Sequence, residues 1–545
     1  MQTLPESEGE RHQGLAKDAV WWRNAVGYEV YIRSFLDTNA DGVGDLAGVT
    51  AKLGYLAELG VDAVWLTPFF PSPGFDHGYD VADYLDVDPQ FGTLADIDAL
   101  IVEAHRLGLK IFVDVVPNHT SSHHHWFQSA IADVDSPYRD YYLFRPGGPD
   151  GGPPNNWVSH FGGSAWTADP AGTGEYYCHL FLPEQPDLNW ANPAVLEEFS
   201  AILRFWCERG TDGFRIDVAH ALMKHPEFHD NPVLHPVVPG MHPTDVFMSY
   251  DHQFDLHQIE TVEVFRKWRQ VVAPYGAVLL GEMDTRDTAR YGAFVGNGDA
   301  LDLGFVLKIG LTGWEPKRQI DDLIEYLQAA NGGAAWEVSN HDQARAVSRF
   351  GGGEIGLRRA LALTTLMVVI DGMTFIYQGE ELGLPDAVVT GETEDPMSGR
   401  NGGGWGRDVA RGGMPWDASA HNGFSSATDT WLETEALPRQ FTVEFQMSQP
   451  GSTWSRYRDL IQLRKRLRSA FDRPMRLAAR EDAVLVVERG PLVAIANFSD
   501  HPYRYEPTST STFSVEFESV RDGCLAGDDS IVVQPEATVI LLRGN

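Results

Sequence analysis

The alternation of short apolar runs with amphipathic stretches most constrains how this 545-residue chain can fold. Stretches such as LAGVTAKLGYLAELG and LADIDALIVEAHRLG place apolar residues at i, i+3, i+4 and i+7, as in a helix with one buried face. Between such stretches the pattern predicts eight strands, at residues 27–33, 62–66, 110–115, 213–218, 277–281, 301–306, 335–338 and 374–377. The alternation implies a parallel sheet of the α/β class. Eight units of this length predict a closed (β/α)8 TIM barrel, with a doubly wound sheet as the alternative.

Two segments depart from this repeat and predict additional domains. Residues 119–189 follow the third strand, are rich in His, Gly, Pro and Asn, and are too long for an ordinary connection. We expect them to form an inserted lid domain. From residue 471 the pattern changes to short strands such as AVLVVE and LVAIANF, which predicts a C-terminal antiparallel, sandwich-like β domain over 471–545. The barrel then comprises residues 1–118 and 190–470.

The composition argues against several classes of partner. The 42 Lys and Arg residues against 77 Asp and Glu give a net charge of −35, which disfavours binding to nucleic acid or to an anionic membrane. Three scattered cysteines indicate neither a disulfide framework nor a zinc site. The polar N-terminus shows no signal peptide, and no apolar run reaches the roughly 20 residues of a membrane span. These features predict a cytoplasmic protein.

The fourth predicted strand, GFRIDVAH, carries the first candidate catalytic pair. Side chains two apart on a strand share a face, so Arg215 and Asp217 point the same way. A neighbouring guanidinium favours the ionised carboxylate that a nucleophile requires, although a structural ion pair would give the same pattern. Glu282 follows the apolar run VLLG at the end of the fifth strand, where burial favours the protonated form of a general acid.

Other predicted strands also end in polar residues. The third ends in DVVPNH, with Asp114, Asn118 and His119, and the seventh ends in SNHD, with His341 and Asp342. In a (β/α)8 barrel the catalytic groups lie at the C-terminal ends of the strands. Two principal carboxylates with a third acid suit glycoside hydrolysis, in which one carboxylate attacks the anomeric carbon and the other protonates the leaving oxygen.

The loop DTNADGVGD after the first predicted strand is a candidate cation site. Its oxygen ligands would be Asp37, Asn39, Asp41, Asp45 and the backbone carbonyl of Val43. Alternating acids in a Gly-containing loop suit a hard cation, and a polar turn without metal is the alternative. We therefore expect one structural Ca²⁺ or Mg²⁺ and no cofactor for catalysis.

The motifs DVVPNH, QPDLN, GFRIDVAH, LLGE and SNHD occur in this order along the chain. With them the chain resembles glycoside hydrolase family 13, the α-amylase family. Within this family, the motif QPDLN at residues 185–189 resembles the one found in the branch of oligo-1,6-glucosidases and α-glucosidases. The resemblance implies a retaining, exo-acting α-glucosidase that releases terminal non-reducing glucose from short α-glucosides through a covalent β-glucosyl-enzyme intermediate. Transglucosylation is compatible with this mechanism.

The resemblance also implies a role for each site residue. Asp217 would be the nucleophile, Glu282 the acid/base and Asp342 the stabiliser of the transition state. Asp76, paired with Arg411, would bind the outermost hydroxyl of the glucose. The remaining substrate-binding residues implied by the resemblance are Tyr79, which would stack on the sugar ring, and His119, Phe161, Phe181, Gln185, Arg215 and His341. The DTNADGVGD loop is similar to the structural calcium loop of this branch.

The residues after the nucleophile give conflicting indications of the linkage. Val218 accompanies α-1,6 activity in this branch, whereas DVAH resembles α-glucosidases that act on α-1,4 links. The nearest alternative function is a sucrose isomerase or trehalose synthase on the same scaffold, although the RLDRD loop of sucrose isomerases is absent. A non-catalytic, transporter-associated relative is disfavoured because all three acids are present. The expected substrates are oligosaccharides of the maltose or isomaltose type, or sucrose.

Overall fold

A computed structural model describes residues 17–283, 287–296, 298–400, 406–507, 512–526 and 530–544. Eight parallel strands close into a barrel in the order β1-β11-β10-β9-β8-β7-β3-β2. The strands are β1 (Val26–Val30), β2 (Ala63–Leu66), β3 (Lys110–Val115), β7 (Gly213–Ile216), β8 (Val278–Gly281), β9 (Leu303–Phe305), β10 (Ala334–Glu337) and β11 (Met373–Tyr377). Each overlaps one predicted strand, and the closed ring confirms the barrel over the doubly wound sheet.

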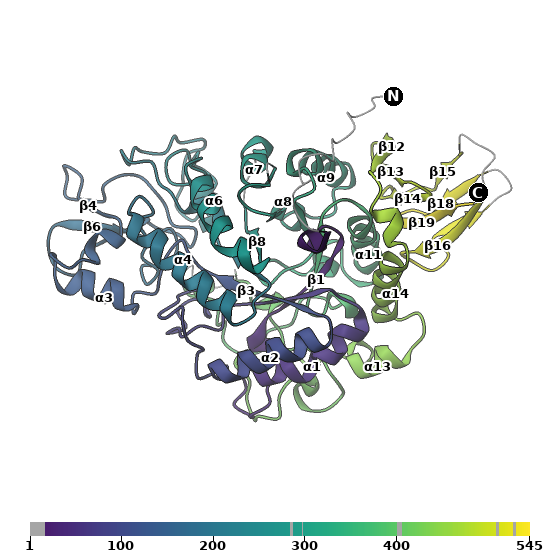
Figure 1. Ribbon diagram of the computed structural model, residues 1–545, viewed down its shortest axis with the longest axis horizontal. Coiled ribbons are helices and arrows are strands. Elements are labelled where there is room, and N and C mark those ends of the chain that lie inside the picture. Colours follow the sequence, from purple (N-terminus) through teal and green to yellow (C-terminus); the bar gives the residue numbers. More distant parts are fainter. Residues whose placement is uncertain are drawn as a thin grey trace.

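Helices surround the barrel (Figure 1). Their bounds are α1 (Leu46–Leu59), α2 (Leu94–Arg106), α3 (His125–Ala132), α4 (Pro193–Glu208), α5 (Pro243–Phe247), α6 (Thr261–Val272), α7 (Thr288–Val295), α8 (Leu307–Gly310), α9 (Pro316–Ala330), α10 (Ala346–Arg349), α11 (Gly353–Val369), α12 (Pro396–Arg400), α13 (Val443–Ser448), α14 (Thr453–Arg466) and α15 (Arg468–Phe471). The helix α2 shows why they form: a capping box between Thr93 and Asp96 starts it, and Ile97, Leu100 and Ile101 bury one face.

Large aromatic side chains fill the barrel interior. Trp65, Phe112, Phe305 and Phe375 belong to one buried cluster contributed by the strands. Room for the rings comes from a glycine, because a Cβ on Gly213 would stand 2.4 Å from the Phe112 ring. The barrel is therefore a packed core whose upper surface can hold polar groups rigidly.

The predicted insertion forms a small domain of its own between β3 and α4. Its sheet has the order β4-β6-β5, with strands Phe144–Pro146, Glu175–Cys178 and Trp166–Ala168. Asp187 joins the insertion to the barrel, because its backbone pairs with His119 and its carboxylate forms an ion pair with Lys224, with Oδ2 2.9 Å from Nζ. This domain lies at one end of the molecule in Figure 1, with the C-terminal sheets at the other.

The C-terminal region packs two antiparallel sheets against each other, as predicted. One has the order β12-β13-β14-β19-β16 and the other β15-β18-β17. The strands are β12 (Arg476–Glu481), β13 (Val484–Arg489), β14 (Leu492–Asn497), β15 (Tyr503–Tyr505), β16 (Phe513–Glu518), β17 (Cys524–Ala526), β18 (Ile531–Val533) and β19 (Ala537–Arg543). Val493, Ile495, Val533 and Val539 belong to the buried cluster of this region.

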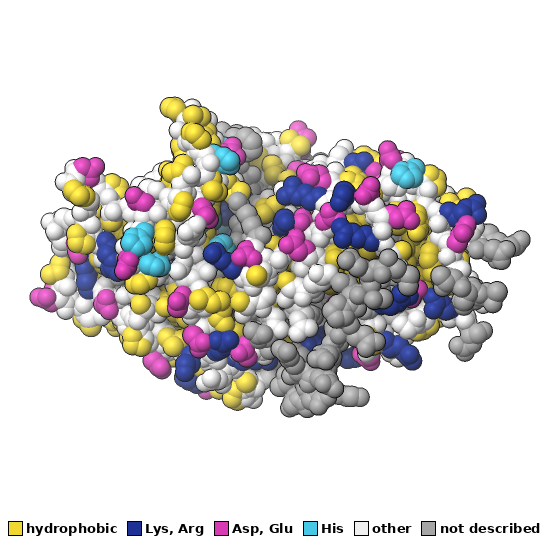
Figure 2. Space-filling model, turned by 90° about the horizontal axis from the view of Figure 1, so that it is seen from above, with side chains coloured by type: hydrophobic (Ala, Val, Ile, Leu, Met, Phe, Trp, Pro, Cys, Tyr) yellow, Lys and Arg dark blue, Asp and Glu magenta, His cyan; other side chains and the backbone are white. Residues whose placement is uncertain are grey.

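Acidic and basic side chains are interspersed on the face shown in Figure 2. Among the described residues, no helix combines the length and the apolar character needed to span a bilayer. The cytoplasmic location expected from the sequence stays a prediction.

Candidate active site

Three carboxylates from three neighbouring strands meet around one guanidinium at the carboxyl end of the barrel. Arg215 Nη1 donates to Asp114 Oδ1 at 3.0 Å and to Asp217 Oδ1 at 2.5 Å. Its Nη2 lies 3.0 Å from Glu282 Oε2. The arginine is itself held from below, because its Cζ lies 5.0 Å from the centre of the buried Trp65 ring. We call these four charged residues the strand cluster.

The backbone after Asp217 is strained and links two of these acids. Val218 has φ 43°, a left-handed conformation that costs a β-branched residue free energy. In this conformation its N–H donates to Glu282 Oε2 at 2.9 Å, and the N–H of Ala219 donates to the Glu282 carbonyl at 3.0 Å. The strained conformation of Val218 therefore fixes the spacing between Asp217 and Glu282.

Electrostatics favour the protonated forms of two acids in the strand cluster. Burial raises the pKa of Asp114 to about 7, against the opposing effect of Arg215. Burial also raises the pKa of Asp217, and the charges of Glu282 and Asp114 add to this effect while Arg215 opposes it. One cation therefore does not offset the cost of burying both carboxylates in ionised form. The Glu282 side chain is 18% exposed and that of Asp217 only 8%, so Glu282 is the more accessible of these two acids.

His341 lies beside this cluster, with a polar partner at each ring nitrogen. Burial lowers the pKa of His341 to about 3 and raises that of Glu29 well above its usual value, which favours a neutral ring beside a protonated carboxyl. Glu29 Oε1 lies 2.5 Å from His341 Nδ1. His341 Nε2 lies 2.9 Å from the Tyr79 hydroxyl and 3.3 Å from Asp342 Oδ2. The ring is clamped between Tyr31 and Tyr79, whose centroids lie 5.5 and 5.4 Å away.

A second arginine cluster forms at the rim of the site from loops. Arg407 Nη2 donates to Asp76 Oδ1 at 2.6 Å and to Asp395 Oδ1 at 2.8 Å. Arg411 Nη2 donates to Asp342 Oδ1 at 2.8 Å, and Arg407 Nη1 lies 3.3 Å from the same oxygen. We call these five residues the rim cluster.

The expected pairing of Asp76 with Arg411 is wrong, because Arg407 makes that contact. The two arginines flank a single 3-10 turn, Asp408–Ala410, and so reach different acids. Burial alone would raise the pKa of Asp342, but nearby positive charge holds it well below its usual range. Because the pKa of His341 is lowered to about 3, this effect at neutral pH comes from Arg407, Arg411 and Arg215.

The remaining predicted substrate residues lie along the insertion side of the same site. Gln185 Nε2 donates to Asp76 Oδ2 at 3.2 Å and lies 3.0 Å from His119 Nε2. Phe161 and Phe181 pack edge to face, 5.6 Å apart, and the Arg407 guanidinium lies 5.2 Å from the Phe161 ring. Every predicted catalytic and substrate-binding residue therefore lies in a connected set of contacts.

The DTNADGVGD loop is held by its own hydrogen bonds. The Asp37 carboxylate accepts from three backbone N–H groups of the loop and from the Ser425 hydroxyl. Burial opposes its ionisation, but these bonds hold the pKa of Asp37 below its usual value. Asp45 caps α1 by accepting from Gly48 N–H at 2.6 Å. Within the described residues, this loop does not bring three His, Cys, Asp or Glu ligand atoms within 4.8 Å of one another.

Four residues of the site were missed by sequence reasoning. Arg407 and Asp395 lie in a long loop without periodic pattern, so nothing local marked them. Glu29 and Glu337 lie on β1 and β10 and are buried. An acid inside an apolar strand is a signal that could have identified Glu29 and Glu337, because burying a carboxylate is costly unless it is paired or hydrogen-bonded.

A barrel whose mouth gathers acids around two arginines has the chemistry of a glycoside hydrolase. The family model "Alpha amylase, catalytic domain" matches residues 29–472. Over 468 residues the chain is 41% identical to a probable alpha-glucosidase of Rhizobium meliloti, covering 83% of this chain and 84% of that one. It is 37% identical to an oligo-1,6-glucosidase of Parageobacillus thermoglucosidasius, over 82% of this chain and 84% of that one.

Solved structures agree with this assignment. An alpha-glucosyl transfer enzyme superposes with a TM-score of 0.89 at 35% identity, covering 96% of this chain and 99% of that one. A trehalulose synthase from Pseudomonas mesoacidophila superposes with a TM-score of 0.83 at 32% identity, with coverage of 96% and 99%. The chain belongs to the α-amylase family of glycoside hydrolases, in the branch that contains the α-glucosidases and oligo-1,6-glucosidases.

Proposed function

We propose that this glycoside hydrolase is a retaining, exo-acting α-glucosidase that releases terminal non-reducing glucose from short α-glucosides. The observation that carries the proposal is the contact between Arg407 and Asp76 at 2.6 Å. Asp76 and Arg407 are largely buried charged groups bonded to each other, and such a pair forms a rigid wall. In the proposal, this wall closes the site behind the terminal sugar, so that a single glucose is released. The wall also offers fixed donors and acceptors to the hydroxyls of that sugar.

In the proposed reaction, an Asp217 oxygen attacks the anomeric carbon and forms the glucosyl-enzyme ester. Glu282 gives its proton to the departing glycosidic oxygen, so the bond to the leaving sugar breaks as the ester forms. The ionised Glu282 then takes a proton from water, whose oxygen attacks the anomeric carbon and releases Asp217. Asp342, kept ionised by its arginines, would stabilise the positive charge of the transition state.

The glucosyl-enzyme has a second fate, which makes transglucosylation or isomerisation the alternative function. If a sugar hydroxyl replaces water in the second step, the product is a new disaccharide instead of free glucose. The structural similarity to a trehalulose synthase supports this alternative. On the linkage, the oligo-1,6-glucosidase relative agrees with Val218, whereas the DVAH sequence favours α-1,4 links. We propose a mixed α-1,4 and α-1,6 specificity.

Initial rates on maltose, isomaltose, sucrose and trehalose, with product analysis, test this proposal. We expect hydrolysis to give two glucose molecules per bond cleaved in maltose, isomaltose and trehalose, and one glucose with one fructose in sucrose. The glucose from the non-reducing side should initially keep the α-configuration, as monitored by NMR of its anomeric proton. Conversion of sucrose mainly to an isomeric disaccharide would replace the hydrolase with the isomerase. Initial formation of β-glucose would exclude the covalent mechanism.

We also propose that the DTNADGVGD loop binds one structural Ca²⁺ or Mg²⁺. Its donor set of carboxylate and amide oxygens fits a hard cation, and the exposed Asp41 and Asn39 have oxygens open to solvent. Binding would tie the loop after β1 to the start of α1. Melting temperature should rise with Ca²⁺ and fall with EDTA, and Asp41→Ala should abolish the difference. An unchanged melting temperature would leave the loop as a turn closed by its own hydrogen bonds.

A further inference from the structure

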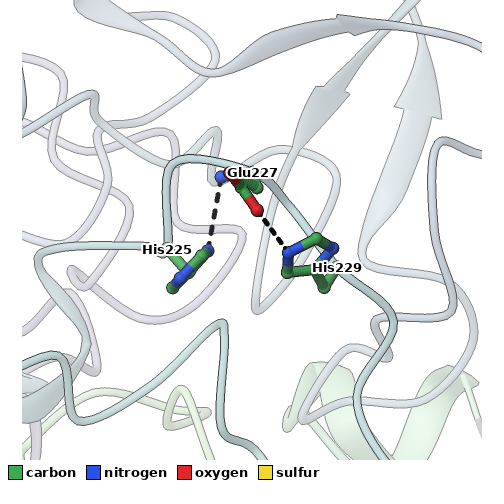
Figure 3. A group of neighbouring side chains, drawn as sticks. All are labelled: His225, Glu227 and His229. Carbon is green, nitrogen blue, oxygen red and sulfur yellow. Dashed lines mark hydrogen bonds and ion pairs between the residues drawn. The ribbon is translucent and has the colours of Figure 1, made fainter.

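The loop that follows the nucleophile carries a cluster of metal-ligating side chains outside the active site. His225, Glu227 and His229 each offer one ligand atom, and these three atoms all lie within 4.8 Å of one another (Figure 3). Glu227 Oε2 already lies 2.6 Å from His229 Nε2, and the N–H of Glu227 lies 3.3 Å from His225 Nδ1. The spacing i, i+2, i+4 would place the three side chains on one face of a strand, but residues 225–229 lie in a loop, where a turn gathers them instead.

The turn that gathers these ligands is fixed by its backbone. Phe228 N–H donates to the His225 carbonyl at 3.1 Å, which closes the turn. Phe228 has φ 51°, a left-handed conformation that few residues other than glycine, asparagine and aspartate adopt. It brings His229 back toward His225. Strain of this kind persists only where surrounding contacts hold it.

Those contacts come from the inserted domain. Asn155 Nδ2 donates to the Phe228 carbonyl and Trp157 Nε1 to the His229 carbonyl, both at 2.9 Å. The Phe228 ring packs against Trp157 with a centroid distance of 5.3 Å. The two imidazoles are therefore carried by a turn whose carbonyls and ring are anchored to a second domain.

A shared aromatic partner orients the imidazoles themselves. Phe254 lies edge to face against both His225 and His229, with centroid distances of 5.2 and 5.3 Å. Its carbonyl accepts from the His225 N–H at 2.8 Å. Ligands held in position before binding lose little conformational freedom when an ion arrives.

We propose that His225, Glu227 and His229 bind one divalent transition-metal ion of the zinc class. Two imidazoles and one carboxylate suit Zn²⁺, Co²⁺ or Ni²⁺, whereas Ca²⁺ and Mg²⁺ prefer oxygen ligands alone. The ion replaces the two hydrogen bonds drawn in Figure 3 and leaves a coordination position for water, since Glu227 and His229 are exposed. It fixes the turn 225–229 and, through it, the contact between this loop and the inserted domain. The chemistry at Asp217 does not pass through it.

Calorimetry of the tag-free, EDTA-stripped full chain with Zn²⁺ tests the proposal. We expect one equivalent to bind, with affinity at least tenfold weaker in His225→Ala and in His229→Ala. His235→Ala is the matched control, because His235 is an exposed histidine of the same loop outside the cluster, and it should keep the parent affinity. Asp217→Asn is a second control. Unchanged Zn²⁺ affinity in this variant would exclude binding to the strand cluster.

Co²⁺ supplies a readout that does not depend on stability. The visible absorption of bound Co²⁺ should indicate a low-coordinate site of nitrogen and oxygen ligands in the parent chain and in His235→Ala. This absorption should be absent in the His225→Ala/His229→Ala double variant. Absence of saturable Zn²⁺ binding would overturn the proposal. So would binding that survives in the double variant, because the ion would then sit elsewhere.

Discussion

The strand cluster and the rim cluster both centre on buried arginines, but they are built differently. Arg215 projects from β7 and meets acids that lie on or directly after neighbouring strands. Arg407 lies in the long loop after β11 and meets Asp76 and Asp395, which are 331 and 12 residues away in sequence. The first cluster is held by the hydrogen-bonded barrel, and the second mainly by its own ion pairs.

The two kinds of support suit different tasks within the site. A barrel strand cannot shift without breaking its ladder, so groups that must lie in register with a reacting carbon belong there. Loops tolerate change, so the groups that select among substrates belong on them. We therefore expect changes at Asp217 and Glu282 of the strand cluster to lower turnover most, and a change at Arg407, which holds Asp76 in the rim cluster, to alter which sugars are accepted.

The largest expected effect comes from Asp217→Asn. The amide keeps the shape and an acceptor for Arg215 but removes the nucleophile, so kcat should fall by at least about 10⁴-fold. Stopped assays of glucose release measure the loss, and circular dichroism shows that the fold is kept. Activity within tenfold of the parent would remove Asp217 from the nucleophile role.

Glu282→Gln should be less severe and should depend on the leaving group. Without a proton donor, kcat on a disaccharide should fall by about 10²–10⁴-fold. An aryl glucoside with an acidic phenol needs little protonation, so formation of the glucosyl-enzyme should be largely preserved. A burst of phenol followed by slow turnover would show this. An equal loss on both substrates would contradict the acid/base assignment.

In the rim cluster, Arg407→Ala should lower kcat/KM on disaccharides by about 10²-fold, because Asp76 loses a buried partner. The wall also opens, so glucosides extended at the non-reducing end should become substrates. Arg411→Ala is the matched comparison in the same loop: it contacts Asp342 and should reduce kcat without admitting longer chains. If the two variants behave alike, the division of roles within the rim cluster is wrong.

Within the strand cluster, Asp114→Asn should remove an ionisation from the pH profile. Burial raises the pKa of Asp114 to about 7, so the parent kcat/KM should change as pH rises through this value and Asp114 gains a negative charge beside Arg215. Asn cannot ionise, so the change in kcat/KM near pH 7 should be lost in the variant. A profile that keeps its change near pH 7 would show that another group causes it.

The smallest effect concerns stability beneath the strand cluster. Burial raises the pKa of Glu337 to about 8 from the 4.5 of a free side chain, so the folded state holds a proton that the unfolded chain has released. Stability is therefore lost as pH rises from about 4.5 to 8. Glu337→Gln keeps the acceptor for Asn340 and should unfold a few degrees higher than the parent at pH 8, with a smaller gain at pH 5. Glu58→Gln, on the exposed side of α1, should show no such gain.

The eight strands and the pairing of Arg215 with Asp217 could be predicted from the sequence, because both follow from short-range periodicity, whereas closure of the strands into a barrel was seen only in the structure. A strand repeats every two residues, so Arg215 and Asp217 had to share a face, and an acid after an apolar run had to lie at the barrel mouth. Each predicted strand overlaps one in the structure for the same reason. These inferences need only residues within a few positions of each other.

The pairing of acids and arginines within the rim cluster depends on long-range contacts and could not be predicted from the sequence. Arg407 and Arg411 are four residues apart in an irregular loop, and both lie within reach of Asp342. Which of them also meets Asp76 depends on the path of the loop after β11 over the barrel mouth. Loop paths are set by long-range contacts that no local pattern records. The turn that gathers His225 and His229 was hidden for the same reason, since its conformation is held by Asn155 and Trp157 of another domain.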